Sequence, residues 1–165
     1  MRILLKFVVN CDADAAWRAL HSPQAMAEVY GPLLTMDADA RPSRWEDGDD
    51  LIVRLRLGGA VPVGSQLIAI SDRTARETSG PVRIVRDAGM PLTGPLAALT
   101  GWDHQMAVSP DPADPERTLW RERLIVTGPA APALWPLLWA GWQWRAVRIR
   151  ALAPGWAHDP APAPE

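Results

Sequence analysis

The stretch LWPLLWAGWQWRAVRIRAL, residues 134–152, decides the fold, because it is the segment that best fits a long helix. Apolar residues recur in and just beyond it at spacings of four and three, at Trp135, Trp139, Trp142, Ala146, Ile149 and Ala153. This periodicity predicts a helix with one apolar stripe. Pro136 favours a start of the regular helix close to that residue, since a proline inside a helix removes a backbone hydrogen bond.

The segments before this helix have sequence patterns typical of strands. Residues 51–57 (LIVRLRL) alternate, with leucines and Val53 on one face and arginines on the other, which indicates a half-buried strand. Strands are predicted at 2–9, 51–57, 65–71, 74–79, 82–87, 101–108 and 118–126. The glycines and prolines of 89–100 indicate a loop with room for a helical turn.

Two short helices are predicted directly after the first strand. Asp12 is a good N-cap for the first helix, and Asp14 follows in its first turn. Ser22 and Pro23 start the second helix, with the serine as cap and the proline at the first helical position. This helix is expected to end near Gly31 and Pro32.

A curved antiparallel sheet needs an element that covers its apolar concave face, and only the terminal helix is long enough to do so. We therefore predict an α+β helix-grip fold. In it, a curved antiparallel sheet of about seven strands wraps around a long C-terminal helix, with two short helices after the first strand. Residues 1–153 are predicted to form one such domain, and 154–165 a Pro/Ala-rich tail. A cavity is expected where helix and sheet do not touch.

Composition excludes several classes of function. A chain of 165 residues, 48% of them hydrophobic, fits a single domain. The net charge of −2 gives no basic footprint for nucleic acid. No segment offers the roughly 18 uncharged apolar residues of a membrane span. Residues 1–10 do not resemble a signal peptide, so a cytoplasmic location is expected.

Neither a metal nor a cofactor is expected. Cys11 is the only cysteine, and His21, His104 and His158 do not stand in metal-ligand spacing. The pair Gly58-Gly59 lacks the context of a nucleotide-binding loop and is interpreted as a turn. A metal site assembled by the fold from distant residues stays open.

Four segments together resemble a known superfamily. These are 12–20 (DADAAWRAL), 101–108 (GWDHQMAV), 118–126 (TLWRERLIV) and 142–152 (WQWRAVRIRAL). With the order of predicted elements, they make residues 2–153 similar to the START/Bet v 1-like (SRPBCC) superfamily, which includes polyketide cyclase/dehydrase-like and lipid-transport proteins. The resemblance implies a helix-grip fold around a small hydrophobic ligand. Its members include carriers, aromatase/cyclases and chaperone regulators, so fold alone does not select among them.

The best candidates for chemistry are His104 and Glu122. Both stand at even positions of predicted strands, on the more apolar faces. A connection centred on Ala113 predicts that His104 lies opposite Glu122, and Met106 opposite Trp120. The carboxylate then orients the imidazole for proton transfer, or the pair holds the strand register without doing chemistry.

Aromatic residues are the second signal for a ligand site, because nine of the residues are tryptophans. Ring faces stack on flat apolar ligands, although the same residues also fill cores. The predicted ligand-contacting residues are Trp17, Tyr30, Trp102, His104, Met106, Trp120, Glu122, Trp139 and Trp142. Arg145, Arg148 and Arg150 are interpreted as a solvated helix face.

Three functions remain open from the sequence. The leading hypothesis is a non-catalytic binder of a small hydrophobic ligand that is aromatic, polyketide-like or a lipid. The alternative is a cyclase/aromatase-like enzyme that uses His104 and Glu122 as acid and base. The third is a protein-interaction module that uses surface tryptophans. A homodimer stays open in each case.

Overall fold

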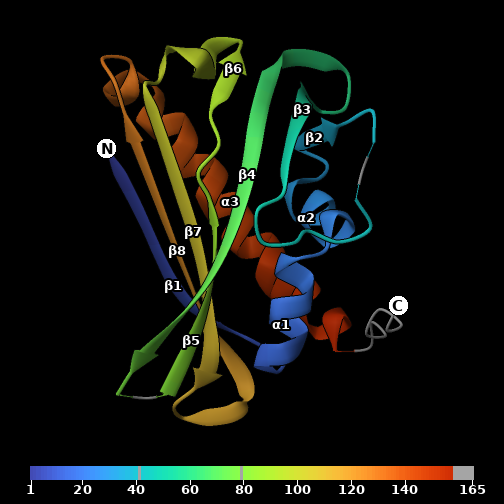
Figure 1. The fold of residues 1–165 in the computed structure, drawn as a ribbon, viewed down its shortest axis with the longest axis vertical. Coiled ribbons are helices and arrows are strands. Elements are labelled where there is room, and N and C mark those ends of the chain that lie inside the picture. The colour runs from blue at the N-terminus through green and yellow to red at the C-terminus, as the bar shows by residue number, and fades with distance from the viewer. Residues whose placement is uncertain (41, 79, 158–165) are drawn as a thin grey trace.

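The computed structural model describes residues 1–40, 42–78 and 80–157, and it has the predicted α+β helix-grip architecture (Figure 1). The elements follow in the order β1 (Arg2–Val9), α1 (Ala13–Leu20), α2 (Pro23–Tyr30), β2 (Leu34–Asp37), β3 (Asp50–Leu57), β4 (Val61–Glu77), β5 (Gly80–Asp87), β6 (Pro91–Thr93), η1 (Pro95–Ala98), β7 (Gly101–Asp111), β8 (Asp114–Thr127) and α3 (Ala131–Trp156).

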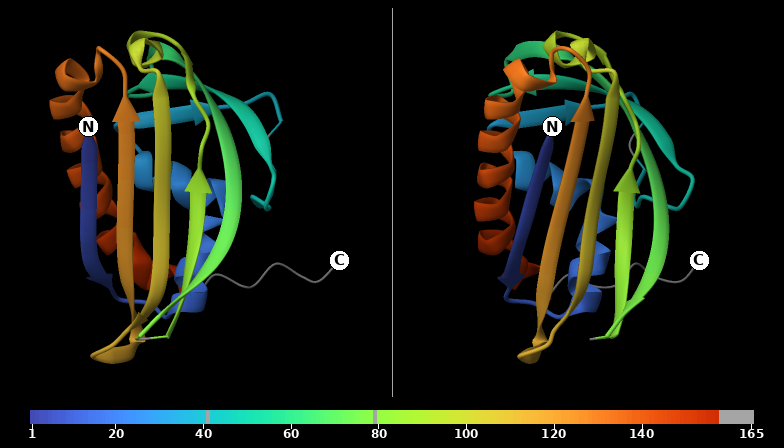
Figure 2. Two further views of the ribbon diagram at one scale, coloured as in Figure 1. Left: turned by 60° about the vertical axis from the view of Figure 1, so that its left-hand side comes forward. Right: turned by 90° about the vertical axis from the view of Figure 1, so that its left-hand side faces the viewer.

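The strands form one curved antiparallel sheet. Seven of them lie in the order β1-β8-β7-β5-β4-β3-β2, and the short β6 pairs with β4 off this path. Figure 2 shows α3 running along one side of this sheet, with α1 and α2 beside its C-terminal part. The long helix therefore lies in the grip of the sheet, as predicted.

Strand β4 produces the bend of the sheet. Its first half pairs with β3, from Val61 to Ala69, and its second half pairs with β5, from Ile70 to Glu77. The separate strands predicted at 65–71 and 74–79 are thus wrong, because they are one strand of 17 residues. The polar residues between them, Asp72 and Arg73, do not end the strand, since they pair with Val85 and Ile84 of β5.

Two short strands were not predicted. Strand β2 has four residues and β6 has three, too few for an alternating pattern to be recognised. The helical turn expected within 89–100 is present as η1. Strand β2 pairs with β3 and extends the curled half of the sheet toward α2.

Both short helices begin at the predicted caps. The Asp12 carboxylate accepts hydrogen bonds from the amides of Asp14 and Ala15, and the Ser22 hydroxyl accepts one from Ala25. Each cap satisfies amides that have no partner inside the helix. The second helix ends at Tyr30, close to the predicted Gly31 and Pro32.

The terminal helix is longer than predicted at both ends. It begins at Ala131 and carries Pro136 in its second turn, so the predicted start near that proline is wrong. It continues to Trp156, whose buried ring lies 5.9 Å from that of Trp120. The predicted tail therefore does not begin at Pro154, because burial of Trp156 stabilises a further turn. The rest of the predicted tail, 158–165, lies outside the described residues.

The apolar stripe of α3 is only partly the predicted one. Trp142, Ala146, Ile149 and Ala153 are buried as expected. Trp139 is 46% exposed, and Leu138 takes the inward position instead. Arg145, predicted to be solvated, is 1% exposed. The periodicity showed the helix but misplaced its inward face by part of a turn, because an ion pair draws an arginine into the core.

Candidate ligand cavity

A cavity of about 540 Å³ lies between α3, α2 and the curled half of the sheet. Its position follows from the bend in β4, which carries β3 and β2 away from the helix. The wall is mostly apolar. Its apolar members from β2, β3 and β4 are Leu34, Met36, Leu51, Val53, Leu55, Leu57, Val63, Ile68 and Ile70, and Gln66 is the polar member from these strands. The N-terminal half of α3 closes the other side with Leu134, Leu138 and Trp142.

Five of the predicted ligand-contacting residues line this cavity. Tyr30 comes from α2, Trp102, His104 and Met106 come from β7, and Trp142 comes from α3. The three elements are far apart in sequence, and the fold brings them together around one cavity.

The other four predicted residues lie elsewhere. Trp120 is fully buried in the core beside Phe7, with ring centroids 6.4 Å apart. Trp17 packs against His21 and lies beneath the guanidinium of Arg83. Trp139 faces outward, and Glu122 on β8 pairs with Arg145 in the middle of α3. Some inward-facing strand residues therefore lie in the core and others on the cavity wall. The alternation of apolar and polar residues in the sequence does not distinguish the two.

The predicted register of β7 and β8 is wrong by two residues. His104 pairs with Leu124, and Met106 pairs with Glu122. A turn of two residues joins the strands, which end at Asp111 and begin at Asp114. Beyond Pro110 the pairing is irregular: Pro110 faces Thr118 but Asp111 faces Asp114, so β8 carries extra residues there. A shift of two residues keeps every side chain on its face. His104 and Glu122 are consequently both inside, as predicted, but as diagonal neighbours.

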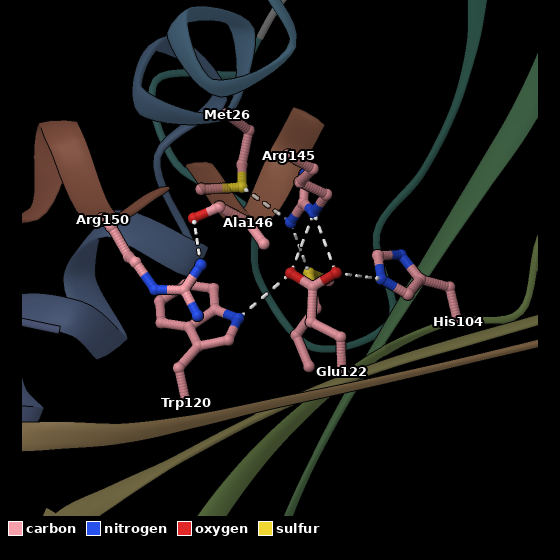
Figure 3. A network of polar contacts seen from close by, with 8 residues as sticks. Met26, His104, Trp120, Glu122, Arg145, Ala146 and Arg150 are labelled. Carbon is pink, nitrogen blue, oxygen red and sulfur yellow. Dashed lines mark hydrogen bonds and ion pairs between the residues drawn. The ribbon is translucent and has the colours of Figure 1, made fainter. Parts of the chain in front are cut away.

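Glu122 is the centre of a buried polar network (Figure 3). Its carboxylate accepts hydrogen bonds from Arg145 Nε at 2.8 and 3.1 Å and from Trp120 Nε1 at 3.0 Å. His104 Nε2 lies 3.5 Å from Oε2, longer than a well-formed hydrogen bond. In Figure 3 the carboxylate has Trp120 on one side, His104 on the other and Arg145 above it. A buried charge is tolerated when it is paired in this way.

This environment keeps Glu122 ionised. Burial alone raises the pKa of the carboxyl group, but the charge of Arg145 and the contacts from His104 and Arg145 outweigh it. The pKa is lowered from 4.5 to about 2. At neutral pH Glu122 is therefore a hydrogen-bond acceptor with its oxygens occupied, and it has no proton to donate.

Arg145 is the cavity-lining residue that the sequence patterns placed wrongly. Its Nη2 lies 3.1 Å from the sulfur of Met106 and 3.5 Å from that of Met26, and its guanidinium carbon lies 4.7 Å from the Tyr30 ring centroid. Burial lowers the pKa of Arg145, but Glu122 and Tyr30 more than offset this and raise it. The available signal was its position three residues after Trp142, on the inward face of the helix.

The described residues contain no group of three or more histidine, cysteine or acidic side chains that could hold a metal. His21 is buried, with Nε2 2.8 Å from Asp72 and Nδ1 2.9 Å from the carbonyl of Trp17. His158 lies outside the described residues. None of the helices among the described residues combines the length and the hydropathy that a membrane span requires.

No family model matches the chain, and no curated protein matches it in sequence. Solved structures do match. A structural-genomics protein from Chromobacterium violaceum aligns with a TM-score of 0.69 at 14% identity, over 96% of this chain and 98% of its own. A hypothetical protein from Helicobacter pylori aligns with a TM-score of 0.64 at 13% identity, over 93% of this chain and 88% of its own.

A named protein is also similar in structure. Norcoclaurine synthase from Thalictrum flavum, in complex with dopamine and hydroxybenzaldehyde, aligns with a TM-score of 0.60. The identity is 14%, over 98% of this chain and 89% of the synthase. The fold is Bet v 1-like. At this identity the likeness establishes the helix-grip fold, in which a ligand-binding cavity is typical, and leaves the ligand to other arguments.

Proposed function

We propose that this Bet v 1-like protein binds a small hydrophobic ligand, aromatic, polyketide-like or lipid, without catalysing a reaction. The observation that carries the proposal is the apolar cavity between sheet and helix. Its volume of about 540 Å³ lies within the usual range of ligand pockets, about 300–1,000 Å³. Tyr30, Trp102, His104, Met106 and Trp142 are the proposed contacts. Membership of the START/Bet v 1-like (SRPBCC) superfamily is part of the same proposal.

An aromatic ligand is favoured by two further observations. The wall offers the rings of Trp102, Trp142 and Tyr30, whose faces and edges suit flat molecules. The structurally similar norcoclaurine synthase is in complex with dopamine and hydroxybenzaldehyde, which are small aromatic molecules.

The alternative, a cyclase/aromatase-like enzyme, is less well supported. General acid catalysis requires a group that holds a proton near neutral pH, and the pKa of Glu122 is about 2. Its oxygens also accept hydrogen bonds from Arg145 and Trp120. Glu122 therefore fits a structural role, and His104 on the cavity wall makes no well-formed hydrogen bond to it, since Nε2 lies 3.5 Å from Oε2.

The interaction-module hypothesis rests on surface tryptophans. Trp139 and Trp144 are partly exposed on α3, beside the more exposed Leu137. However, Leu137 and Trp144 also line the cavity. Leu137 and Trp144 therefore fit the rim of a ligand site, and of the three only Trp139 lies outside its lining.

Gly141 provides the test. It lines the cavity from α3, and a Cβ built on it meets no atom within 4 Å. Gly141→Leu should fill cavity space and abolish saturable binding of the neutral dye phenylnaphthylamine. It should also stabilise the helix, since glycine costs about 0.5–1 kcal/mol relative to alanine inside a helix.

Gly155→Leu is the matched control, because Gly155 lies on the same helix, also faces open space and does not line this cavity. It should leave dye binding unchanged. Dye fluorescence titration and thermal unfolding of both variants provide the measurement. Equal dye binding by Gly141→Leu and the unchanged protein would refute a ligand site in this cavity.

A further inference from the structure

The polar part of the cavity wall has hydrogen-bond donors without acceptors. Trp102 Nε1, Trp142 Nε1 and Arg145 Nη1 are buried and have no partner among the described residues. All three residues line the cavity. A buried donor without a partner costs free energy, and such groups are uncommon in folded proteins. An acceptor from a bound ligand would satisfy donors that have no partner among the described residues.

The three donors belong to one cluster. Trp142 and Arg145 stand three residues apart on α3, a spacing that places side chains on the same face of a helix. The Trp102 and Trp142 rings meet edge to face with centroids 5.9 Å apart, and His104 lies 5.1 Å from Trp142. The three donors thus belong to neighbouring side chains of α3 and β7, next to His104.

The charges around the cavity determine what kind of acceptor fits. Among the described residues that line it, Arg145 is the only arginine or lysine, and Asp87 is the only acid. The charge of Arg145 is already balanced by Glu122, 2.8 Å away. Asp87 pairs in the sheet with His104, and its Oδ1 accepts hydrogen bonds from the amides of Ala69 and Gly89. A ligand carboxylate would therefore add negative charge where no cation is free to balance it.

We infer that the ligand carries an uncharged acceptor oxygen of the carbonyl type, which receives the N–H groups of Trp142 and Arg145, while its apolar part lies along the curled strands. This inference rests on the proposed ligand-binding function and specifies its chemistry. A ketone, ester or quinone fits the description. A hydrocarbon lacks the acceptor, and a free acid brings the wrong charge.

Three probes of similar shape test the inference by competition against phenylnaphthylamine. Benzophenone has a carbonyl between two phenyl rings, diphenylmethane has a methylene there, and diphenylacetate carries a carboxylate. Benzophenone should bind about 3- to 10-fold tighter than diphenylmethane, which corresponds to one net hydrogen bond. Diphenylacetate should bind most weakly of the three at neutral pH.

Trp142→Phe removes the indole N–H and keeps an aromatic ring. It should reduce the benzophenone-to-diphenylmethane ratio by at least half. Trp139→Phe, on the exposed side of the same helix, should keep the ratio. Because the ratio is taken within each variant, a general loss of affinity or stability cancels.

The outcomes separate the two proposals. Failure of the dye and all probes to bind would refute ligand binding itself. Equal binding of benzophenone and diphenylmethane, with saturable dye binding, would overturn only the carbonyl inference. Tightest binding by diphenylacetate, or an unchanged ratio in Trp142→Phe, would overturn it as well.

Discussion

The two halves of α3 face the same sheet but have different surroundings. The C-terminal half packs onto β1, β8 and α1, where Ile149, Ala153 and Trp156 meet Phe7 and Trp120 in a closed core. The N-terminal half faces β3 and β4 across the cavity, with Leu134 and Leu137 on its wall. Both halves are rich in apolar residues, so hydrophobicity does not explain the difference.

The geometry of the sheet explains it. Strands β1, β8 and β7 run close beneath the helix, while β4 changes partner at Ala69 and Ile70 and carries β3 and β2 away (Figure 1). A straight helix cannot follow a sheet that bends, so space opens at one end. Arg145 and Glu122 lie at the boundary between the two halves.

The largest effect is expected at this boundary. Arg145→Leu leaves the Glu122 carboxylate buried without its cation and should lower the free energy of unfolding by about 3–5 kcal/mol. Arg148→Leu, one turn further along, should cost less than about 1 kcal/mol, because Arg148 donates to the Glu28 carbonyl at the surface. Urea unfolding of both variants measures the difference.

The double variant Glu122→Leu/Arg145→Leu shows whether the loss in Arg145→Leu comes from the unpaired charge of Glu122 or from the loss of packing around Arg145. It should regain most of the stability, since an apolar replacement of both partners leaves no unpaired charge. A double variant as unstable as Arg145→Leu alone would show that the network does more than balance its own charges.

The next largest effect is a difference in stability loss between alanine substitutions in the two halves of α3. Ile149→Ala empties space in the closed core and should cost about 2–5 kcal/mol. Leu137→Ala, 69% exposed at the cavity rim, should cost less than about 1 kcal/mol and mainly alter dye affinity. Similar losses of stability at both positions would contradict the division of α3 into a closed and an open half.

A smaller effect is expected from acid. The pKa of Glu122 is lower in the folded protein than its ordinary value, so its ionised form stabilises the fold above about pH 4.5. That contribution is lost as the pH falls from 4.5 toward about 2, by on the order of 3 kcal/mol at most. In Glu122→Gln this part of the pH dependence should disappear.

Urea unfolding at several pH values between 2 and 6 measures it, with the other acidic groups titrating in both proteins. Parallel stability curves for Glu122→Gln and the unchanged protein would show that Glu122 keeps an ordinary pKa. The Arg145 pair would then be weaker than its geometry indicates.

Local signals in the sequence predicted most of the fold. The caps at Asp12 and Ser22 fixed the two short helices, because capping depends on residues within one turn. The four- and three-residue spacing in 134–152 predicted the long helix. Alternation placed His104 and Glu122 on the inner face, and this survived a register error of two residues because the side-chain period of a strand is also two.

Tertiary structure alone decided the site. Whether an inward residue such as Trp120 or Trp102 meets core or cavity depends on where β4 bends, and the bend arises from pairing between distant strands. The burial of Arg145 likewise required Glu122, 23 positions earlier in the chain, to lie across from it. The sequence by itself determined the two short helices, the long helix and most of the strands, together with the inner faces of β7 and β8. The shape of the space between them came from long-range packing, which no local periodicity encodes.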